Sequence, residues 1–469
     1  MSVLDVRRRI FTEPAPLASI AASPRAPWYA VATVCVGAFM GQLDASIVTL
    51  ALPTMSRDFG VSVGAVEWVS LSYLLTVVAA VTVFGWLADA IGRKLLYTYG
   101  FGVFVLGSAL CGFAPNLGLL IAARVLQALG AAMLQANSVA LIRQVMPPDR
   151  LGRGIGVQGA AQAVGLALGP TVGGLLMTLG GWPLIFLVNV PFGLVGLVAG
   201  RYLLPRSAPS CRNPFDTVGA ALFVPASALL LVVVSLGREL RWDSVLPYAV
   251  LGGAVALAVT FVRHERRTRY PFVAMSLFGN RTFVAGVTTA LLSYLVMFGL
   301  LFAAPFVLQY AHGLSPAHAG LLLGAFPVCL AITAPLAGRL ADAVGARVVT
   351  ACGLLLTTVA LAWLAFAAGT TGLVVGLAVA GIGLGAFTPA NNAAVMGAVP
   401  RERAGTAGGL LNMIRGMGTA LGVAVTGVVY EGFAGSGAGG GFRAAALFLA
   451  AAALAGAALC LSVRTQRGS

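Results

Sequence analysis

Long apolar runs follow one another along almost the whole chain, and this feature most restricts how it can fold. A helix needs about 20 mostly apolar residues to cross a bilayer, and we count fourteen such runs. Only 9% of the residues are charged, whereas soluble proteins carry about 25%. We therefore expect an all-helical integral membrane protein. The runs lie near residues 29–54, 64–88, 94–114, 117–142, 154–179, 183–204, 217–237, 245–262, 283–309, 316–338, 347–367, 371–397, 405–430 and 443–463.

The distribution of basic residues supports this count. Short cytoplasmic loops of membrane proteins are enriched in Arg and Lys. If the N-terminus is cytoplasmic, most basic residues fall in alternate, cytoplasmic segments. The exceptions on the opposite side are Arg57, Arg238, Arg241 and Arg443. Hydropathy alone leaves thirteen or fifteen helices open, but the charge pattern favours fourteen, with both termini in the cytoplasm.

Several function classes are excluded by the scarcity of reactive groups. Lys94 is the only lysine and is followed by Leu95, so the Gly-Lys-Ser/Thr sequence of a phosphate-binding loop is absent. The six cysteines include no C-x-x-C pair, and the three histidines lie near predicted loops. We therefore expect no metal, no cofactor and no enzymatic activity. The net charge is +15, but the basic residues are dispersed, which argues against nucleic-acid binding.

The residues before the first apolar run have no clear targeting signal. Arg7, Arg8 and Arg9 resemble a twin-arginine signal only faintly, and Glu13 and Pro14 interrupt the stretch after them. We expect residues 1–27 to be a mobile cytoplasmic lead held near anionic lipid.

An internal repeat divides the chain. The stretch GWLADAIG at 85–92 recurs 253 residues later as GRLADAVG at 338–345. The first copy follows the second predicted helix and its partner follows the tenth, so two halves of six helices flank an extra pair. The same offset relates Pro147 to Pro400, Gly165 to Gly418 and Gly169 to Gly422. The expected segments are a lead (1–27), an N-terminal six-helix bundle (28–205), a linker with two inserted helices (206–270), a C-terminal six-helix bundle (271–464) and a tail (465–469).

Short motifs stand at fixed places relative to these helices. They are Leu43-Asp44-Ala45-Ser46 in the first, Gly85-x-Leu-x-Asp89-x-x-Gly92-Arg93-Lys94 after the second, Arg124-x-x-Gln127-x-x-Gly130 in the fourth, Gly165-x-x-x-Gly169-Pro170-x-x-Gly173-Gly174 in the fifth and Asn189-x-Pro191-x-Gly193 in the sixth. Together they resemble the major facilitator superfamily, and specifically its fourteen-helix drug:proton antiporters. The similarity covers nearly the whole chain from about residue 28.

The resemblance implies a gating role for the glycine and charged motifs. Glycine lets helices approach closely. An Asp beside basic residues can form an ion pair that breaks as the two halves of the transporter move relative to each other. Proline leaves a helix carbonyl without its partner and so permits a bend. Ala90 stands where the family usually has a basic residue. The gating residues implied are Gly85, Asp89, Gly92, Arg93, Gly169, Pro170 and Asp342.

The resemblance also implies proton coupling through Asp44 and Arg124. Asp44 is the most deeply placed carboxylate in the predicted helices, and charges at such depth are costly unless they face a partner or water. The depths of Asp44 and Arg124 differ by roughly 8 Å of helix rise. Helix rise therefore does not decide whether Asp44 and Arg124 touch directly or interact through Gln127. Glu67 and Glu431 lie nearer the predicted outer ends, where solvated rim positions are expected.

Further polar residues lie at mid-membrane depth and are candidates for the substrate path. About half of such residues are expected only to bond neighbouring helices. The candidates are Tyr73, Gln127, Asn137, Gln309, Asn412 and Arg415.

The function that these features imply is a proton-coupled antiporter that exports small, largely apolar organic molecules such as antibiotics. Uptake or facilitated diffusion is the alternative, and a non-transporting receptor or enzyme is disfavoured by the short loops. The expected partners are the substrate, protons and lipid, with a monomeric chain. The Arg-, Ala- and Gly-rich composition favours a bacterial cytoplasmic (inner) membrane.

Overall fold

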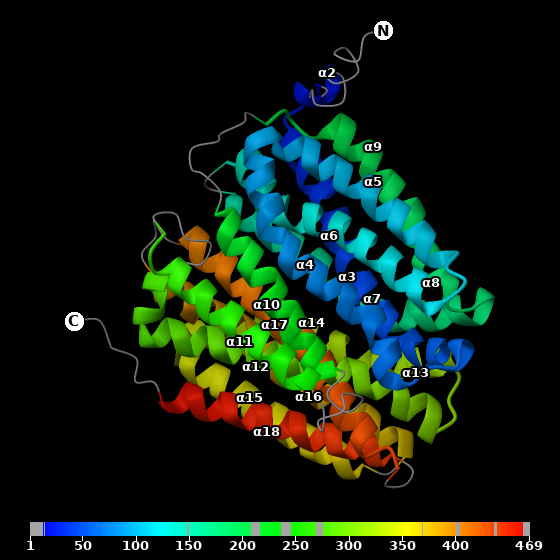
Figure 1. The fold of residues 1–469 in the computed structure, drawn as a ribbon. Helices are drawn as coiled ribbons and strands as arrows, with labels where there is room; N and C mark the ends of the chain where they lie inside the picture. The colour runs from blue at the N-terminus through cyan, green and yellow to red at the C-terminus, as the bar shows by residue number, and fades with distance from the viewer. Residues whose placement is uncertain are drawn as a thin grey trace. The chain divides into compact units, whose positions relative to one another are not determined.

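The computed structural model describes residue 13 and residues 15–147, 150–207, 216–235, 245–268, 275–367, 369–399, 404–435 and 439–462. Every regular element in these ranges is helical (Figure 1). In chain order they are α2 (Ala18–Ala21), α3 (Ala26–Phe59), α4 (Val63–Ile91), α5 (Arg93–Gly112), α6 (Leu117–Val145), α7 (Leu151–Gly180), α8 (Pro183–Leu187), α9 (Asn189–Leu203), α10 (Thr217–Ser235), α11 (Val245–Glu265), η1 (Met275–Gly279), α12 (Arg281–Phe306), η2 (Val307–Ala311), α13 (Pro316–Leu323), α14 (Ala325–Val344), α15 (Ala346–Phe366), α16 (Gly369–Gly397), α17 (Ala404–Gly432) and α18 (Gly440–Ser462).

Twelve helices in the described ranges are long and apolar enough to cross a membrane. Three of them join two elements each: α8 with α9, α12 with η2, and α13 with α14. The inserted pair, α10 and α11, is not among the twelve, although α10 contains a shorter apolar helix at Thr217–Leu230. Twelve spans are therefore shown, and the fourteen-helix arrangement stays a prediction.

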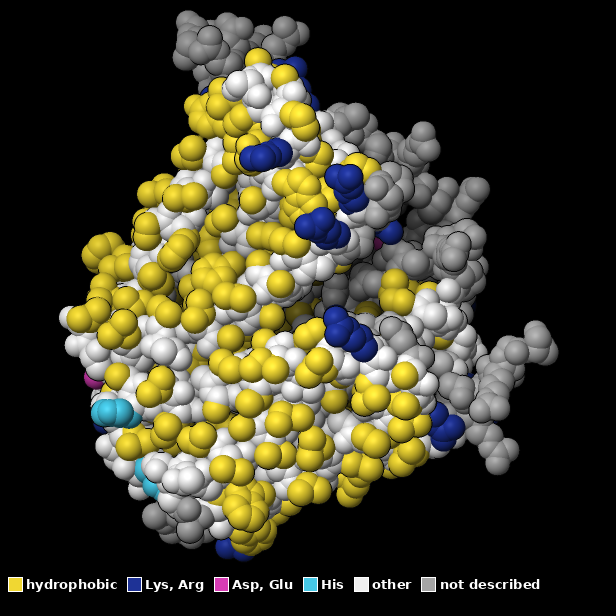
Figure 2. All heavy atoms as spheres, turned by 180° about the vertical axis from the view of Figure 1, so that it is seen from behind, with side chains coloured by type: hydrophobic (Ala, Val, Ile, Leu, Met, Phe, Trp, Pro, Cys, Tyr) yellow, Lys and Arg dark blue, Asp and Glu magenta, His cyan; other side chains and the backbone are white. Residues whose placement is uncertain are grey.

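The described surface fits contact with lipid. Large hydrophobic side chains such as Leu179, Val359 and Trp363 are exposed to 70%, 64% and 56%. Soluble monomers rarely expose apolar surface on this scale. Figure 2 shows one face on which hydrophobic side chains are spread widely and charged side chains are few.

The chain divides into two units, and the division does not follow the predicted bundle boundaries. Unit 1 comprises residues 1–48, 76–169 and 179–215, and unit 2 comprises 49–75, 170–178 and 216–469. In unit 1, α5 packs along α6, α8 and α9. In unit 2, α12 packs on α17 and α18, and α15 packs on α16 and α18. Part of the predicted 206–270 linker, at 208–215, 236–244 and 269–270, lies outside the described residues.

The sequence repeat is also a repeat in packing. A Cβ on Gly165 of α7 would meet the carbonyl oxygen of Phe39 on α3, and one on Gly418 of α17 would meet that of Leu291 on α12. One turn further on, Gly169 lies close to the Ser46 side chain of α3, and Gly422 lies close to the carbonyl oxygen of Leu295 on α12. Each bundle thus brings its fifth helix against its first through small residues, as tight helix pairs in membranes require.

The glycines that precede α5 and α15 form a second equivalent pair. Gly92 has φ +111° and Gly345 has φ +94°, a region that residues with a Cβ rarely adopt. Each is the residue immediately before its helix. Gly85, by contrast, would meet nothing within 4 Å if it carried a Cβ, so close helix packing is not its role in this structure.

The inserted pair belongs to unit 2. Its two helices pack on each other, partly through Phe223 and Phe261 with ring centroids 5.5 Å apart, and α10 also contacts α17. At one end of the pair, Nε2 of His264 lies 2.8 Å from Oδ1 of Asp216. These contacts place the pair beside α17.

The N-terminal lead is anchored at Glu13, near its middle. The Glu13 carboxylate accepts hydrogen bonds from the Ser207 N–H (2.5 Å) and hydroxyl (2.8 Å) and from the Leu95 N–H (3.3 Å). Lys94, fully buried, donates from Nζ to the carbonyl of Leu204 (2.5 Å). The expectation of a mobile lead is therefore wrong at Glu13, which ties the start of α5 to the segment after α9. Residues 1–12 and 14 lie outside the described part.

Candidate functional site

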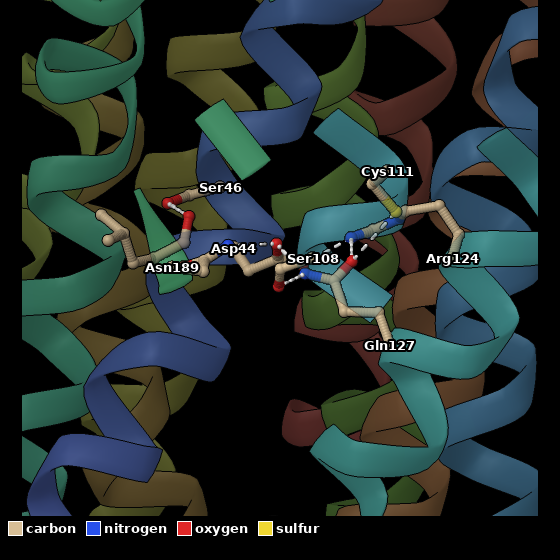
Figure 3. A network of polar contacts seen from close by, with 8 residues as sticks. Asp44, Ser46, Ser108, Cys111, Arg124, Gln127 and Asn189 are labelled. Carbon is tan, nitrogen blue, oxygen red and sulfur yellow. Dashed lines mark hydrogen bonds and ion pairs between the residues drawn. The ribbon is translucent and has the colours of Figure 1, made fainter. Parts of the chain in front are cut away.

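Four helices of unit 1 bring polar side chains together in an apolar interior (Figure 3). Asp44 comes from α3, Ser108 and Cys111 from α5, Arg124 and Gln127 from α6, and Asn189 from the start of α9. All six side chains are buried, and Asp44, Gln127 and Asn189 have 0% exposure. Burying so many polar groups is favourable only if they satisfy one another.

Arg124 and Asp44 form a direct ion pair at the centre of this network. Nη1 of Arg124 lies 2.6 Å from Oδ2 of Asp44 and also donates to Oε1 of Gln127 at 2.6 Å. The guanidinium lies over the Phe186 ring, 5.6 Å from its centroid. The roughly 8 Å difference in depth expected from helix rise does not separate the groups, because the long Arg124 side chain spans it. A relay through Gln127 is not needed for contact.

Gln127 and Asn189 complete the shell around the carboxylate. Nε2 of Gln127 donates to Oδ1 of Asp44 (2.8 Å) and lies 2.8 Å from Oγ of Ser108. Nδ2 of Asn189 donates to the same Asp44 oxygen at 3.0 Å. Arg124 and Gln127 share a helix face because they are three residues apart. Three donors from three residues therefore bond both oxygens of the Asp44 carboxylate.

Ser108, Cys111 and Asn189 are the members of the network that the sequence did not predict. Cys111 is a weak donor to Oε1 of Gln127, with an Sγ–O distance of 3.8 Å. Asn189 was visible in the sixth-helix motif but carried no assigned role. The interruption between α8 and α9, at Val188, is the local signal that could have marked it, since functional side chains often lie where membrane helices break.

A second polar cluster lies in unit 2 and contains two of the predicted substrate-path residues. Arg415 of α17 donates from Nη2 to Oδ1 of Asn392 on α16 and, at 3.4 Å, from Nη1 to Oδ1 of Asn412. Its guanidinium lies over the ring of Tyr294 on α12, 5.3 Å from the centroid. The structure thus brings Arg415 and Asn412 together, with Asn392 and Tyr294 as additional members.

Two of the other predicted path residues, Asn137 and Gln309, bond backbone carbonyls outside the two clusters. Asn137 is buried and donates to the carbonyl of Met133 in its own helix. Gln309, in the π-helical turn η2, donates to the carbonyl of Leu50 at 2.9 Å, which ties η2 to the second half of α3 within unit 2. Tyr73 is buried in α4 at 4% exposure. In this conformation Asn137 and Gln309 make helix contacts.

Two acids expected at a solvated rim make contacts within unit 2 instead. Glu67 of α4 has 0% exposure, and a Cβ on Gly427 of α17 would collide with its carboxylate. Oε1 of Glu431 accepts the N–H of Gly64 at 2.6 Å. The rim expectation is wrong for Glu67, which lies between α4 and α17.

The predicted gating residues lie at helix ends and close approaches. Gly92 immediately precedes α5, which Arg93 begins, and Gly169 packs against Ser46 of α3. Pro170 lies inside α7, and the boundary between the two units falls between it and Gly169. The backbones of Asp89 and Asp342 belong to α4 and α14, and their side chains lie outside the described residues.

Comparison with known proteins agrees with this architecture. The family model described as "Major Facilitator Superfamily" matches residues 34–283 and 286–469. The chain belongs to the major facilitator superfamily. Proteins of this superfamily are membrane transporters of small molecules, so the chain is a multi-pass membrane transporter with no enzymatic activity indicated.

Several bacterial superfamily members are similar over most of their length. The riboflavin transporter RibZ of Clostridioides difficile is 33% identical over 85% of this chain and 87% of its own. The multidrug resistance protein Stp of Mycobacterium tuberculosis is 35% identical over 84% and 74%. The tetracenomycin C resistance and export protein of Streptomyces glaucescens is 30% identical over 86% and 76%.

A solved superfamily structure shares the fold at lower identity. The crystal structure of the peptide transporter POT in complex with sulfate has a TM-score of 0.70 and 17% identity, and the match covers 97% of each chain. At this identity the likeness concerns the fold alone.

Proposed function

We propose that this protein is a proton-coupled antiporter that exports small organic molecules, and that Asp44 is its coupling carboxylate. The observation that carries the proposal is the buried network in which Asp44 faces Arg124, Gln127 and Asn189. Burial makes ionisation of a carboxyl group harder, while a nearby guanidinium and hydrogen-bond donors make it easier. Opposing influences of this kind can hold a group at the point where a small change in access changes its protonation.

Asn189 can satisfy both protonation states of Asp44. With Asp44 ionised, Asn189 donates from Nδ2, and its buried Oδ1 has no hydrogen-bond partner among the described residues. Rotation of the amide would exchange donor for acceptor. Oδ1 could then accept the O–H of a protonated Asp44. Protonation would remove the negative charge facing Arg124, which keeps its contacts with Gln127 and the Phe186 ring.

Coupling would follow from competition between the two states of this network. A proton arriving on Asp44 breaks the ion pair and changes the relative free energies of the two access states. Substrate and proton then weaken each other's binding through that shared equilibrium. During the change of access, α7 would bend between Gly169 and Pro170. A helix hydrogen bond is missing there, and the boundary between the two units crosses α7 at this point.

The remaining features of the proposal concern arrangement in the membrane. We infer fourteen membrane-crossing helices, with α10 and α11 as an inserted pair between bundles at 28–205 and 271–464. Both termini then lie in the cytoplasm, in a bacterial inner membrane, and the chain acts as a monomer without a cofactor other than the coupling proton. The placement of α10 beside α17 supports a peripheral pair.

The test is transport driven by a proton gradient. Inside-out vesicles containing the protein are energised, and proton release on addition of each of a panel of dyes and antibiotics is followed with a fluorescent pH probe. We expect release with the wild type and none with Asp44→Asn. Glu431→Gln is the matched control, since it removes a carboxylate outside the network and should retain the response. Release that persists in Asp44→Asn would exclude Asp44 as the coupling group and turn attention to Glu67.

A second candidate function is uptake of a nutrient, which the similarity to a riboflavin transporter favours. The helix-five motif with Gly169 and Pro170, and the similarity to an export protein, favour export. The sign of the substrate gradient built up by right-side-out vesicles separates the two.

A further inference from the structure

Arg415 is a cation near the middle of a predicted membrane helix, and no described carboxylate pairs with it. It lies about 5 Å of helix rise from the midpoint of α17. In the part of the chain that the structure describes, no acid lies within ion-pair distance of it, and its hydrogen-bond partners are the amide oxygens of Asn392 and Asn412. The cluster therefore keeps a net positive charge, which is costly at that depth.

A purely structural role does not account for this charge. Joining α16 to α17 needs a hydrogen-bond donor, and a neutral glutamine could supply one without the cost of a cation at that depth. The Nε–H of Arg415 is buried and has no hydrogen-bond partner among the described residues. A buried donor left in this state costs about 1–3 kcal/mol. The cluster thus has both charge and donor capacity beyond what the helix contacts use.

The side chains around Arg415 indicate which kind of ligand this cluster could bind. Asn412 is exposed, so one side of the cluster is open. Tyr294, under the guanidinium, forms a stacked pair with Phe298, with ring centroids 6.3 Å apart and planes at 25°. A guanidinium binds a carboxylate through paired N–H groups, and aromatic rings favour a flat partner beside them.

We propose that Arg415, Asn392, Asn412 and Tyr294 form a binding site for an aromatic organic anion, with the carboxylate on Arg415 and the ring system beside Tyr294. The inference rests on the proposed export function, because it names the substrate class. It states a property of unit 2 alone and requires no part of the Asp44 network.

The test compares binding of 2-naphthoate with that of 2-naphthamide, which has the same rings without the charge. Binding to purified protein in phosphatidylcholine nanodiscs needs no proton gradient, so it can succeed or fail independently of proton-driven export. We expect the wild type to bind the carboxylate at least about tenfold more tightly, as a charge-assisted hydrogen bond predicts. Arg415→Gln should abolish this preference. Arg415→Lys should retain part of it, because the charge remains and the planar fork is lost.

Two controls make the outcome decisive. Arg339→Gln removes the same charge from an exposed residue of α14 in unit 2 and should leave the preference unchanged. Equal binding of the two probes by the wild type, absence of binding by both, or a preference that survives Arg415→Gln would overturn the proposal. Nanodiscs that contain phosphatidylglycerol form the last arm. Loss of naphthoate binding in these nanodiscs would mean that Arg415 binds a lipid phosphate. That result would also refute a substrate site.

Discussion

Arg124 and Arg415 both lie inside predicted membrane helices, yet their guanidinium groups have different partners. Arg124 is 1% exposed and pairs with Asp44 at 2.6 Å. Arg415 is only partly buried and is bonded to neutral amides. A buried ion pair offsets its own charge, whereas a cation bonded to amides leaves its charge available. The N-terminal cluster therefore suits a proton switch, and the C-terminal cluster suits a negatively charged ligand.

The difference is notable because the same two bundles share their helix packing. The equivalent glycines at 165 and 418, and at 169 and 422, bring corresponding helices together in each unit. The position equivalent to Asp44, 253 residues later, is Met297. Duplication thus preserved the backbone contacts, which depend on small residues, while the polar side chains diverged. Shared packing with different chemistry lets one scaffold hold two kinds of site.

The largest expected effect comes from separating the charges of the Asp44–Arg124 pair. Asp44→Asn leaves the Arg124 charge buried without its counterion, which should lower the free energy of unfolding by about 3–5 kcal/mol. The double variant Asp44→Asn, Arg124→Gln removes both charges and should recover most of that loss. Unfolding of the purified protein in a denaturing detergent measures both. A double variant no more stable than the single one would mean that the pair is not electrostatically coupled.

A smaller effect tests whether the two bundles pack alike. Alanine at Gly169 or at Gly422 would push a methyl group into the facing helix, and overpacking of this kind costs about 1–3 kcal/mol. We expect similar losses of unfolding free energy for both variants. Gly156→Ala, on the same helix as Gly169, meets nothing within 4 Å and should be neutral or stabilising. A loss confined to one bundle would contradict the equivalence.

The smallest expected effect is that of Arg415→Gln on stability. No acid among the described residues is left unpaired by this change, and relief of the charge and of the unpaired Nε–H should offset the lost hydrogen bonds to Asn392 and Asn412. The free energy of unfolding should therefore shift by less than about 1 kcal/mol. The same unfolding titration applies, with Asp44→Asn measured in parallel. A loss as large as that of Asp44→Asn would show that Arg415 has a charged partner and would remove the contrast between the two arginines.

Much of the fold could be predicted because it depends on local composition. Apolar runs of about 20 residues specify membrane helices wherever they occur, and twelve of the expected spans are present among the described residues. The two inserted helices form where expected, but they are not among the twelve candidate spans of the described residues, so that they cross the membrane stays a prediction. The repeat was readable because its glycines are required by packing at corresponding places.

The site could be predicted only in part. Asp44, Arg124 and Gln127 were identified as charged or polar residues deep in predicted membrane helices, where such residues are costly and usually functional. The direct contact of Asp44 with Arg124 was not predictable from helix rise, because rise ignores the length of an arginine side chain. Ser108 and Asn189 are ordinary polar residues in sequence. Only the packing of α5 and α9 brings Ser108 to Gln127 and Asn189 to this carboxylate.

The sequence by itself determined which segments become helices, which of them are related by duplication and where costly polar groups lie, since these depend on hydropathy and on residue identity. Only the tertiary structure decided which charges are neutralised. It paired Arg124 with Asp44 and left Arg415 among amides, and it buried Glu67 against α17 instead of leaving it at a rim. The physical reason is that the free energy of a buried charge depends on groups within a few ångströms of it, and those neighbours come from helices far apart in the chain.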